Sequence, residues 1–194
     1  MVRVMIAKQT LRAQHLTVRD AIAESTRIEA ALAVSDIGAV SLEERAGGAV
    51  VAGYHPIRSE LDPRPLMAAL AAAGARLALP AVISKTEIVF RELSRTGTLE
   101  AGAFGTFHPP ASAPELQPDI LLMPLCVFDG AGNRIGYGAG HYDRAIAKLL
   151  AAGATPLLVG LAFEEQRAPS VPVEDHDMPL DMILTPSGLQ EFAR

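Results

Sequence analysis

Glycine, charged and aromatic residues are concentrated at residues 128–144, directly after an apolar run and before a segment with helical periodicity. Gly136, Gly138 and Gly140 can adopt backbone angles that other residues avoid, so several main-chain N–H groups can approach one anion. A helix that follows such a loop points its positive end at the same anion. Arg134 adds a full positive charge. The segment therefore predicts a phosphate-binding corner.

Further charges are spaced so that they could join this corner. Asp143 offers the oxygen ligands that Mg²⁺ prefers. A second carboxylate could come from the acidic residues 174–181, although these also fit a solvated turn. Lys8 and Arg12 are four residues apart, hence on one face of a helix. They either reach an anion or are ordinary surface charges.

The glycine segment does not match the common nucleotide-binding fingerprints. A Gly-x-Gly-x-x-Gly motif would need glycine where His141 or Asp143 stands, and the Gly-Lys-Ser/Thr of a Walker loop is absent. A tight turn with a glycine-rich helix entry is the alternative interpretation. A mere turn has no need of the neighbouring charges, such as Arg144, so we favour an anion site.

Composition restricts the possible classes of protein. The 194 residues are enough for one core, which predicts a single domain over residues 1–194. The net charge of -5 argues against nucleic acid and anionic membranes as partners. The chain has no apolar stretch of about 20 residues for a membrane span, and residues 1–6 are too short for a signal-peptide core. We expect a cytoplasmic protein.

The only cysteine, Cys126, excludes an internal disulfide framework and a thiolate zinc cluster. It lies in the apolar run at residues 120–128, where a buried small hydrophobe is expected more often than a nucleophile. The histidines lack the paired spacing of a zinc protease site.

The periodicity of the chain predicts the elements that position these residues. Residues 7–44 have helical periodicity, and Thr17 with Asp20 and Ser41 with Glu44 resemble the capping boxes of helix starts. A helix is predicted at residues 63–73 and another at 142–152. Strands are predicted at residues 49–55, 76–83, 86–90, 119–128, 156–163 and 182–185, with a loop of short extended pieces at 97–118. This alternation predicts an α/β fold with a mainly parallel central sheet, helices on both faces and a helical N-terminal region.

Together these segments resemble the 5-formyltetrahydrofolate cyclo-ligase family, also called methenyltetrahydrofolate synthetases. The most specific match is GYGAGHYDR at residues 136–144. Weaker matches follow in the family's order along nearly the whole chain: residues 8–12, 54–66 with ELD at 60–62, 79–80, 119–124, FDGAGNR at 128–134, Gln166 and 176–185.

The resemblance implies an enzyme that uses ATP and Mg²⁺ to convert 5-formyltetrahydrofolate into 5,10-methenyltetrahydrofolate, with release of ADP and phosphate. The formyl oxygen is a poor leaving group until the γ-phosphoryl is transferred to it. The neighbouring folate nitrogen then closes the ring and expels phosphate. Such a transfer needs mainly positioning and charge neutralisation. These small molecules are the implied partners, and no obligatory protein partner is implied.

The family's motifs also imply roles for individual residues. Lys8, Arg134 and Tyr142 match catalytic positions, and Asp143 would hold Mg²⁺ with Asp177 as a less certain second carboxylate. The implied nucleotide-binding set is Lys8, Arg12, Arg134, Gly136, Tyr137, Gly138, Ala139, Gly140, His141, Tyr142 and Asp143.

Glu60 would bind the guanidine-like edge of the pterin, which suits a carboxylate fork. Tyr54 and Tyr142 would line the folate pocket, although an aromatic residue there is equally compatible with packing. His108 and His141 depart from the family's usual residues, and neither removes a proposed phosphate or metal contact.

Two other interpretations stay open. A diverged relative could bind a nucleotide without cyclo-ligase activity, although a binding protein has no need of both Asp143 and Glu60. An interaction module could use the glycine segment only as a turn.

Overall fold

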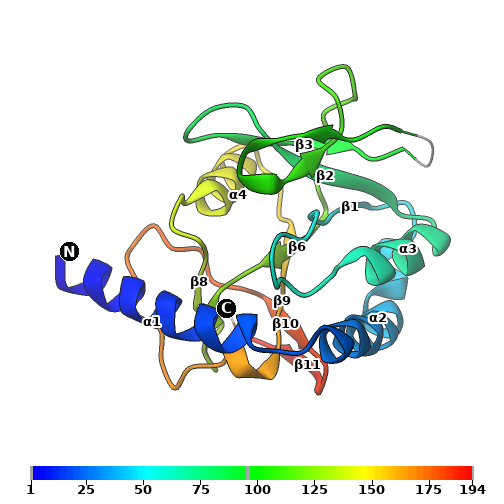
Figure 1. The fold of residues 1–194 in the computed structure, drawn as a ribbon. Coiled ribbons are helices and arrows are strands. Elements are labelled where there is room, and N and C mark those ends of the chain that lie inside the picture. Colours follow the sequence, from blue (N-terminus) through cyan, green and yellow to red (C-terminus); the bar gives the residue numbers. More distant parts are fainter. Residues whose placement is uncertain (1, 95–96, 194) are drawn as a thin grey trace.

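The computed structural model describes residues 2–94 and 97–193. Seven strands form one sheet in the order β11-β10-β9-β6-β1-β2-β3. The neighbouring pairs from β10 to β2 are parallel, whereas β11 and β3 run antiparallel at the two edges. Figure 1 shows α2 and α3 on one side of this sheet and α4 on the other. The predicted α/β fold with a mainly parallel sheet and helices on both faces is confirmed.

Two long helices form the N-terminal region, as predicted: α1 (Val2–Asp20) and α2 (Glu24–Ala46). The two predicted capping boxes are wrong. Thr17 and Ser41 lie inside these helices, and each hydroxyl donates to the carbonyl four residues earlier, on Ala13 and Ile37. Serine and threonine can bond back to a helix in this way, so the same pattern fits a helix interior.

The next elements follow the predicted order. β1 (Val50–Ala52) is shorter than expected, and α3 (Arg64–Ala72) leads to the left-handed Gly74 before β2 (Arg76–Val82) and β3 (Ile88–Glu92). The predicted loop at 97–118 contains β4 (Glu100–Ala101), the short helix η1 (Ala103–Gly105) and β5 (Phe107–His108).

The second half of the chain supplies the centre of the sheet. The apolar run at 119–128 divides into β6 (Ile120–Pro124) and β7 (Val127–Phe128), and β7 pairs with β8 (Arg134–Ile135) outside the main sheet. Then follow α4 (His141–Ala151), β9 (Leu157–Leu161), the short helix η2 (Glu164–Gln166), β10 (Met182–Thr185) and β11 (Gly188–Glu191). β11 was not predicted.

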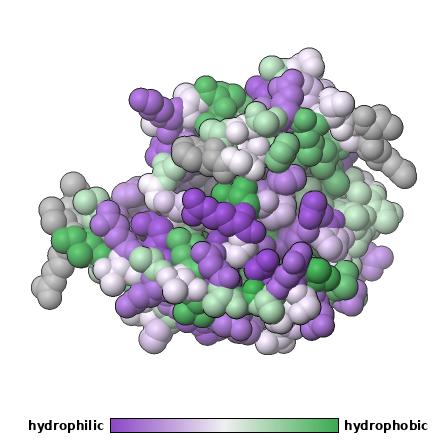
Figure 2. Space-filling model, viewed as in Figure 1, coloured by the Kyte–Doolittle hydropathy of each residue, from purple (hydrophilic) through white to green (hydrophobic). Residues whose placement is uncertain are grey.

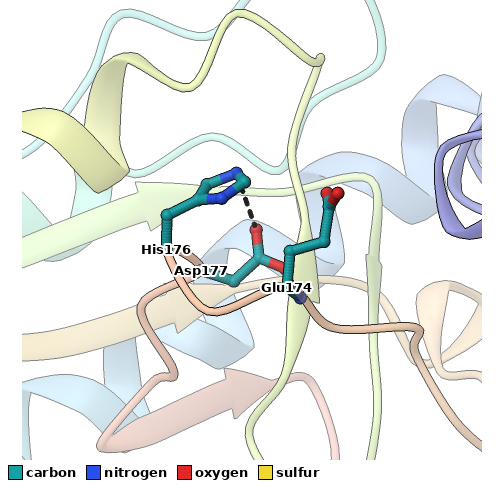
Figure 3. A group of neighbouring side chains, drawn as sticks. All are labelled: Glu174, His176 and Asp177. Carbon is teal, nitrogen blue, oxygen red and sulfur yellow. Dashed lines mark hydrogen bonds and ion pairs between the residues drawn. The ribbon is translucent and has the colours of Figure 1, made fainter. Parts of the chain in front are cut away.

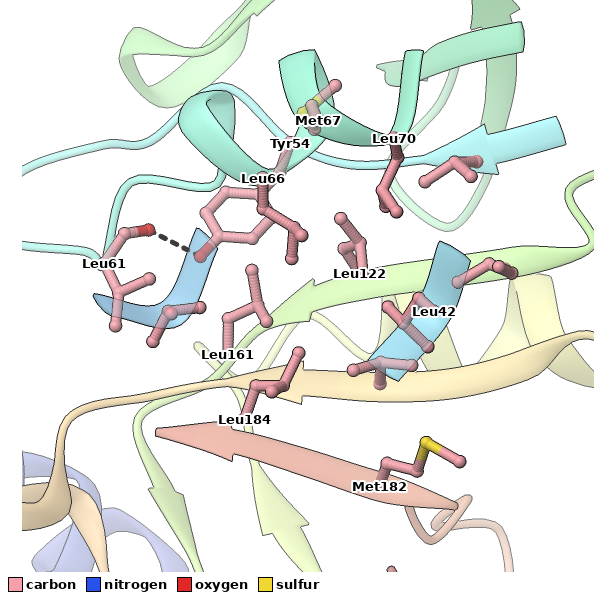
Figure 4. Packing of buried hydrophobic residues seen from close by; sticks show 14 of the residues in the cluster. Leu42, Tyr54, Leu61, Leu66, Met67, Leu70, Leu122, Leu161, Met182 and Leu184 are labelled. Atoms are coloured by element: carbon pink, nitrogen blue, oxygen red, sulfur yellow. Dashed lines mark hydrogen bonds between the residues drawn. The ribbon is translucent and has the colours of Figure 1, made fainter. Parts of the chain in front are cut away.

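Alternate residues of the central strands face two separate cores, because side chains alternate across a strand. Leu122 and Leu161 pack with Leu42 and Leu66 of the helices α2 and α3 (Figure 4). On the other face, Leu121, Met123 and Leu158 pack against α4. Burial on both faces explains why the parallel strands have near-continuous apolar sequences.

The outer surface is mixed in character. Figure 2 shows hydrophobic residues in small groups among hydrophilic ones on the face in view. Over the described ranges 2–94 and 97–193, no helix combines the length and the apolar character that a membrane crossing requires.

The order of the strands also indicates where a ligand site belongs. From β1 the chain moves outward through α3 to β2, whereas β6, β9 and β10 lie on the opposite side of β1. The winding direction thus reverses between β1 and β6. In open parallel sheets, ligands bind beyond the carboxyl ends of the strands at such a switch point.

Candidate active site

The glycine segment connects β8 to α4. Gly138 has a φ of +99° and Gly140, directly before α4, has a φ of +64°. A side chain is strained at these angles, which explains glycine at both positions. Gly136 does not have a positive φ, so it does not adopt the left-handed backbone conformation that glycine allows.

The first helix brings its basic face to this loop. The Nε of Arg12 donates to the Gly136 carbonyl over 2.7 Å. A Cβ atom built on Gly138 would lie 3.3 Å from the Arg12 guanidinium, so the two groups are in close contact. Lys8 lies one turn earlier on the same face. Arg12 therefore contacts the glycine loop directly, whereas Lys8 bonds to Glu174 and Asp177.

Arg134 and Asp143 form an ion pair at the amino end of α4. The Nη2 of Arg134 lies 2.8 Å from the Oδ1 of Asp143, and the Arg134 side chain is only 7% exposed. Its buried Nε has no acceptor among the described residues. The Oδ1 of Asp143 also accepts from the main-chain N–H of Met178 over 3.2 Å, which ties the 174–178 turn to α4.

The acidic turn before β10 lies against Lys8. The Nζ of Lys8 is 3.0 Å from the Oε2 of Glu174 and 2.5 Å from the Oδ2 of Asp177. Burial lowers the pKa of Lys8, but its hydrogen bonds to Asp177 and Glu174 outweigh burial and raise that pKa. Lys8 is therefore fully charged at neutral pH.

Potential metal ligands occur in the same turn. Glu174, His176 and Asp177 place one ligand atom each within 4.8 Å of one another (Figure 3). Asp143 is not in this group and is connected to it through Met178. Asp181, one of the acidic residues predicted as possible Mg²⁺ ligands, accepts from the main-chain N–H of Leu158. This N–H lies at the amino end of the strands, opposite to the candidate site. That contact gives Asp181 a structural role.

Glu60 lies beyond the carboxyl end of β1 and is only 7% exposed. Its Oε2 accepts from the Ile57 N–H over 2.8 Å. Burial raises the pKa of Glu60, while the Ile57 N–H, the charge of Arg19 and the Tyr137 hydroxyl oppose the shift. A buried carboxylate surrounded by donors is suited to a ligand that carries N–H groups.

Tyr142 lies in the first turn of α4. Burial raises the pKa of its hydroxyl, the negative charge of Glu60 raises it further, and the charge of Arg134 opposes the shift. The phenol therefore stays protonated at neutral pH and can donate a hydrogen bond.

Other residues of the predicted site have structural contacts. Tyr54 is 3% exposed, and its hydroxyl donates to the Leu61 carbonyl (Figure 4). This gives Tyr54 a packing role in the segment that carries Glu60. His141 lies 3.1 Å from the Lys85 carbonyl, so it faces the β2–β3 turn. Arg144 donates to the carbonyls of Ala139 and Thr86 and thereby fixes the glycine loop.

Cys126 is buried, as predicted. Burial raises the pKa of its thiol to about 11, so the nucleophilic thiolate is not formed at neutral pH. Gln166, also buried, donates to the carbonyls of Leu125 and Cys126 and so holds the chain where it leaves β6.

Sequence reasoning missed Arg19, a 1% exposed residue whose guanidinium donates to Ser59 and Tyr137. A signal was available, because Arg19 follows Arg12 by seven residues and Lys8 by eleven. These spacings put all three on one helical face.

The parallel sheet and its charged loop define an α/β protein with a candidate ligand site beyond the carboxyl ends of the strands. Comparison with known proteins supplies the family. The model of the 5-formyltetrahydrofolate cyclo-ligase family matches residues 4–186. The chain belongs to this family and is therefore an enzyme of the ligase class.

Individual relatives agree with this assignment. The chain is 32% identical to the 5-formyltetrahydrofolate cyclo-ligase of Mycolicibacterium smegmatis over 72% of this chain and 74% of that one. It is also 32% identical to that of Escherichia coli, over 73% and 80% of the two chains. The structure of Aquifex aeolicus 5,10-methenyltetrahydrofolate synthetase has a TM-score of 0.77 at 28% identity and covers 96% of this chain and 93% of that one.

A more distant structure shares the fold. The Mycoplasma pneumoniae 5,10-methenyltetrahydrofolate synthetase has a TM-score of 0.75 at 23% identity, with coverage of 92% of this chain and 98% of that one. At this identity the likeness concerns the fold alone.

Proposed function

We propose that this chain catalyses the ATP- and Mg²⁺-dependent cyclisation of 5-formyltetrahydrofolate to 5,10-methenyltetrahydrofolate, with release of ADP and phosphate. The observation that carries the proposal is the buried, incompletely paired guanidinium of Arg134. Its guanidinium is buried beside the glycine loop, and its Nε has no acceptor among the described residues. Because a buried N–H without an acceptor is costly, an anionic ligand at this position would complete the arrangement.

On the nucleotide side, the phosphates would lie against the glycine loop. Lys8, Arg12 and Arg134 supply positive charge from two directions, and residues 136–142 supply main-chain N–H groups at the amino end of α4. Phosphoryl transfer depends mainly on alignment and on neutralisation of charge. Fixed cations and main-chain donors fulfil both requirements without a protein nucleophile, consistent with the buried thiol of Cys126.

On the folate side, the Glu60 carboxylate would accept N–H groups from the pterin edge. Tyr142 would donate from its hydroxyl, which stays protonated at neutral pH. We assign Tyr54 to packing rather than to a substrate contact, because its ring is buried and its hydroxyl is bonded to Leu61.

The proposed reaction has two displacements. The formyl oxygen attacks the γ-phosphorus, and the bond from that phosphorus to ADP breaks. The neighbouring folate nitrogen then attacks the formyl carbon and loses its proton, while the carbon–oxygen bond breaks and phosphate leaves. In the first displacement the residues around the glycine loop hold the transferred group, and in the second they hold the departing phosphate.

The carboxylates around the loop fit a Mg²⁺ ion in part. The Oδ1 of Asp143 is used by Arg134 and Met178, whereas its Oδ2 accepts no hydrogen bond from the described residues. Asp143 can therefore offer one oxygen ligand, and Asp177, which now pairs with Lys8, is a candidate for the second. When bound with the nucleotide, Mg²⁺ would neutralise phosphate charge.

The test is the near-ultraviolet absorbance of the purified protein with 5-formyltetrahydrofolate and Mg²⁺, with and without ATP. The methenyl product has an extended conjugation that the substrate lacks, so an ATP-dependent rise is expected. A flat trace from folded protein that still binds ATP would support a diverged nucleotide-binding relative. Failure to bind ATP with Mg²⁺ would favour an interaction module.

A cytoplasmic location and the absence of an obligatory protein partner belong to the same proposal.

A further inference from the structure

Arg19 is a buried cation at the last turn of α1, and it reaches both halves of the candidate site. Its Nη2 donates to the Tyr137 hydroxyl over 2.7 Å, and its Nε donates to the Ser59 Oγ over 3.0 Å. Its Nη1 donates to the Leu125 carbonyl over 3.4 Å, beyond the end of β6. The guanidinium carbon also lies 5.7 Å from the centre of the Tyr137 ring.

This guanidinium forms no direct ion pair with a carboxylate among the described residues, although a buried charge without compensation is costly. Two hydroxyls accept from it instead, those of Tyr137 and Ser59. The Ser59 hydroxyl in turn donates to the Oδ1 of Asp20. Tyr137, Arg19 and Ser59 therefore form a continuous hydrogen-bonded chain, and Ser59 directly precedes Glu60 in the sequence.

This hydrogen-bonded group of side chains joins two segments that are distant in sequence. Tyr137 belongs to the glycine loop, and Ser59, directly before Glu60, belongs to the segment after β1. We infer that Arg19 is a positioning residue that couples the two substrate sites through the Tyr137 hydroxyl, so that binding of either substrate favours binding of the other. The inference rests on the proposed function, since it takes the loop as the nucleotide site and Glu60 as the folate contact.

The coupling has a physical cause in the loop itself. Glycines on both sides of Tyr137 leave the backbone with more freedom than other residues would, and fixing it costs conformational entropy. A nucleotide that orders the loop also fixes the Tyr137 hydroxyl and, through Arg19 and Ser59, the segment that carries Glu60. The second ligand then meets a site that is already ordered, which produces positive cooperativity.

The coupling can be measured by calorimetry. The Kd of 5-formyltetrahydrofolate is determined without nucleotide and with a saturating non-hydrolysable ATP analogue and Mg²⁺. We expect the analogue to tighten folate binding by about fivefold or more in the unaltered chain, within the usual range of coupling energies. Tyr137→Phe, which removes only the hydroxyl, should reduce that ratio to below about twofold.

Arg19→Lys should lose the coupling to the same extent, and the double variant should lose no more than either single variant, because both changes break one connection. Tyr54→Phe is the matched control. It also removes a buried tyrosine hydroxyl, the one bonded to Leu61, but it should keep the coupling ratio. Thermal unfolding of each variant verifies that it is folded.

The outcomes separate this inference from the proposed function. If turnover occurs but the unaltered chain shows no coupling, or if Tyr137→Phe keeps the full ratio, the inference is overturned and the cyclo-ligase proposal stands. Should the unaltered chain bind neither ligand, the proposed function fails and the inference with it.

Discussion

The Arg134 guanidinium lies against the Asp143 carboxylate at the start of α4, with Nη2 2.8 Å from Oδ1. The pair brings together a cation proposed for phosphate and a carboxylate proposed for Mg²⁺. Asp143 compensates a buried charge and, in the proposed function, would offer its second oxygen to a metal. Variants at this position must separate the two roles.

Asp143→Asn tests the metal assignment. The amide can still accept from Arg134 but is a poor Mg²⁺ ligand, so turnover should fall by on the order of 100-fold. Nucleotide affinity with Mg²⁺ should drop to the value measured without the metal, as determined by calorimetry in both conditions. Full activity, or an unchanged gain in affinity from Mg²⁺, would remove Asp143 from the metal site. Arg134→Lys is the control, since it alters the pair but keeps the carboxylate.

Glu60→Gln tests the folate contact. Loss of a charged hydrogen bond of about 1.5–3 kcal/mol should raise the KM for 5-formyltetrahydrofolate by about 10- to 100-fold. ATP affinity, measured without folate, should change little because Glu60 lies outside the glycine loop. Equal losses for both ligands would assign Glu60 a structural role instead.

The same substitution should increase the stability of the folded protein at neutral pH, although it weakens folate binding. Burial raises the pKa of Glu60 above its ordinary value of 4.5, so the folded state favours the neutral acid. The native protein therefore loses stability as the pH rises from 4.5 through the folded-state pKa. Glu60→Gln should melt at a higher temperature than the unaltered protein at pH 7, and the gap should close below pH 4.5. A lower melting temperature at neutral pH would contradict this.

Gly138→Ala should destabilise the loop, because φ at this position is +99° and the new methyl group would meet the Arg12 guanidinium at 3.3 Å. We expect a loss of about 1–3 kcal/mol in the free energy of unfolding. Gly136→Ala is the matched control, since Gly136 has an ordinary φ and open space at its Cβ position. Denaturant titration of both variants is the measurement, and equal effects would refute the backbone argument.

Asp129→Ala should cost about 3 kcal/mol of stability, because it removes the acceptor of several donors at a buried turn. The Asp129 carboxylate accepts from the N–H groups of Ala131, Asn133 and Val171 and from the Asn133 side chain. Burial alone would raise its pKa, but these hydrogen bonds outweigh burial and lower it below 3.8.

A lowered pKa means that this contribution of Asp129 is present above pH 3.8 and is lost as the pH falls through the folded-state value. The stability difference between Asp129→Ala and the unaltered protein should therefore shrink only in strong acid. Thermal unfolding of both proteins between pH 7 and pH 2 measures this difference. A difference that already disappears near pH 5 would show that other groups control the effect.

Strands and helices with strong periodicity were predicted close to their observed bounds. The strands predicted at residues 76–83 and 182–185 correspond to β2 (Arg76–Val82) and β10 (Met182–Thr185), and the helix predicted at 142–152 corresponds to α4 (His141–Ala151). The two capping boxes failed because serine and threonine bonds to a preceding turn have the same local sequence as caps. β11 was missed because its short run has little apolar alternation and is defined by pairing with β10.

The sequence by itself determined the alternation of strands and helices, the glycine-rich loop before α4, and the residue types available for phosphate and metal. These follow from local sterics and periodicity. Only the tertiary structure decided that Lys8 pairs with Asp177, 169 residues away, that Tyr54 is buried, and that Arg19 connects Tyr137 with Ser59. Such contacts depend on how helices pack at the strand ends, where neighbours are set by the fold and not by distance along the chain.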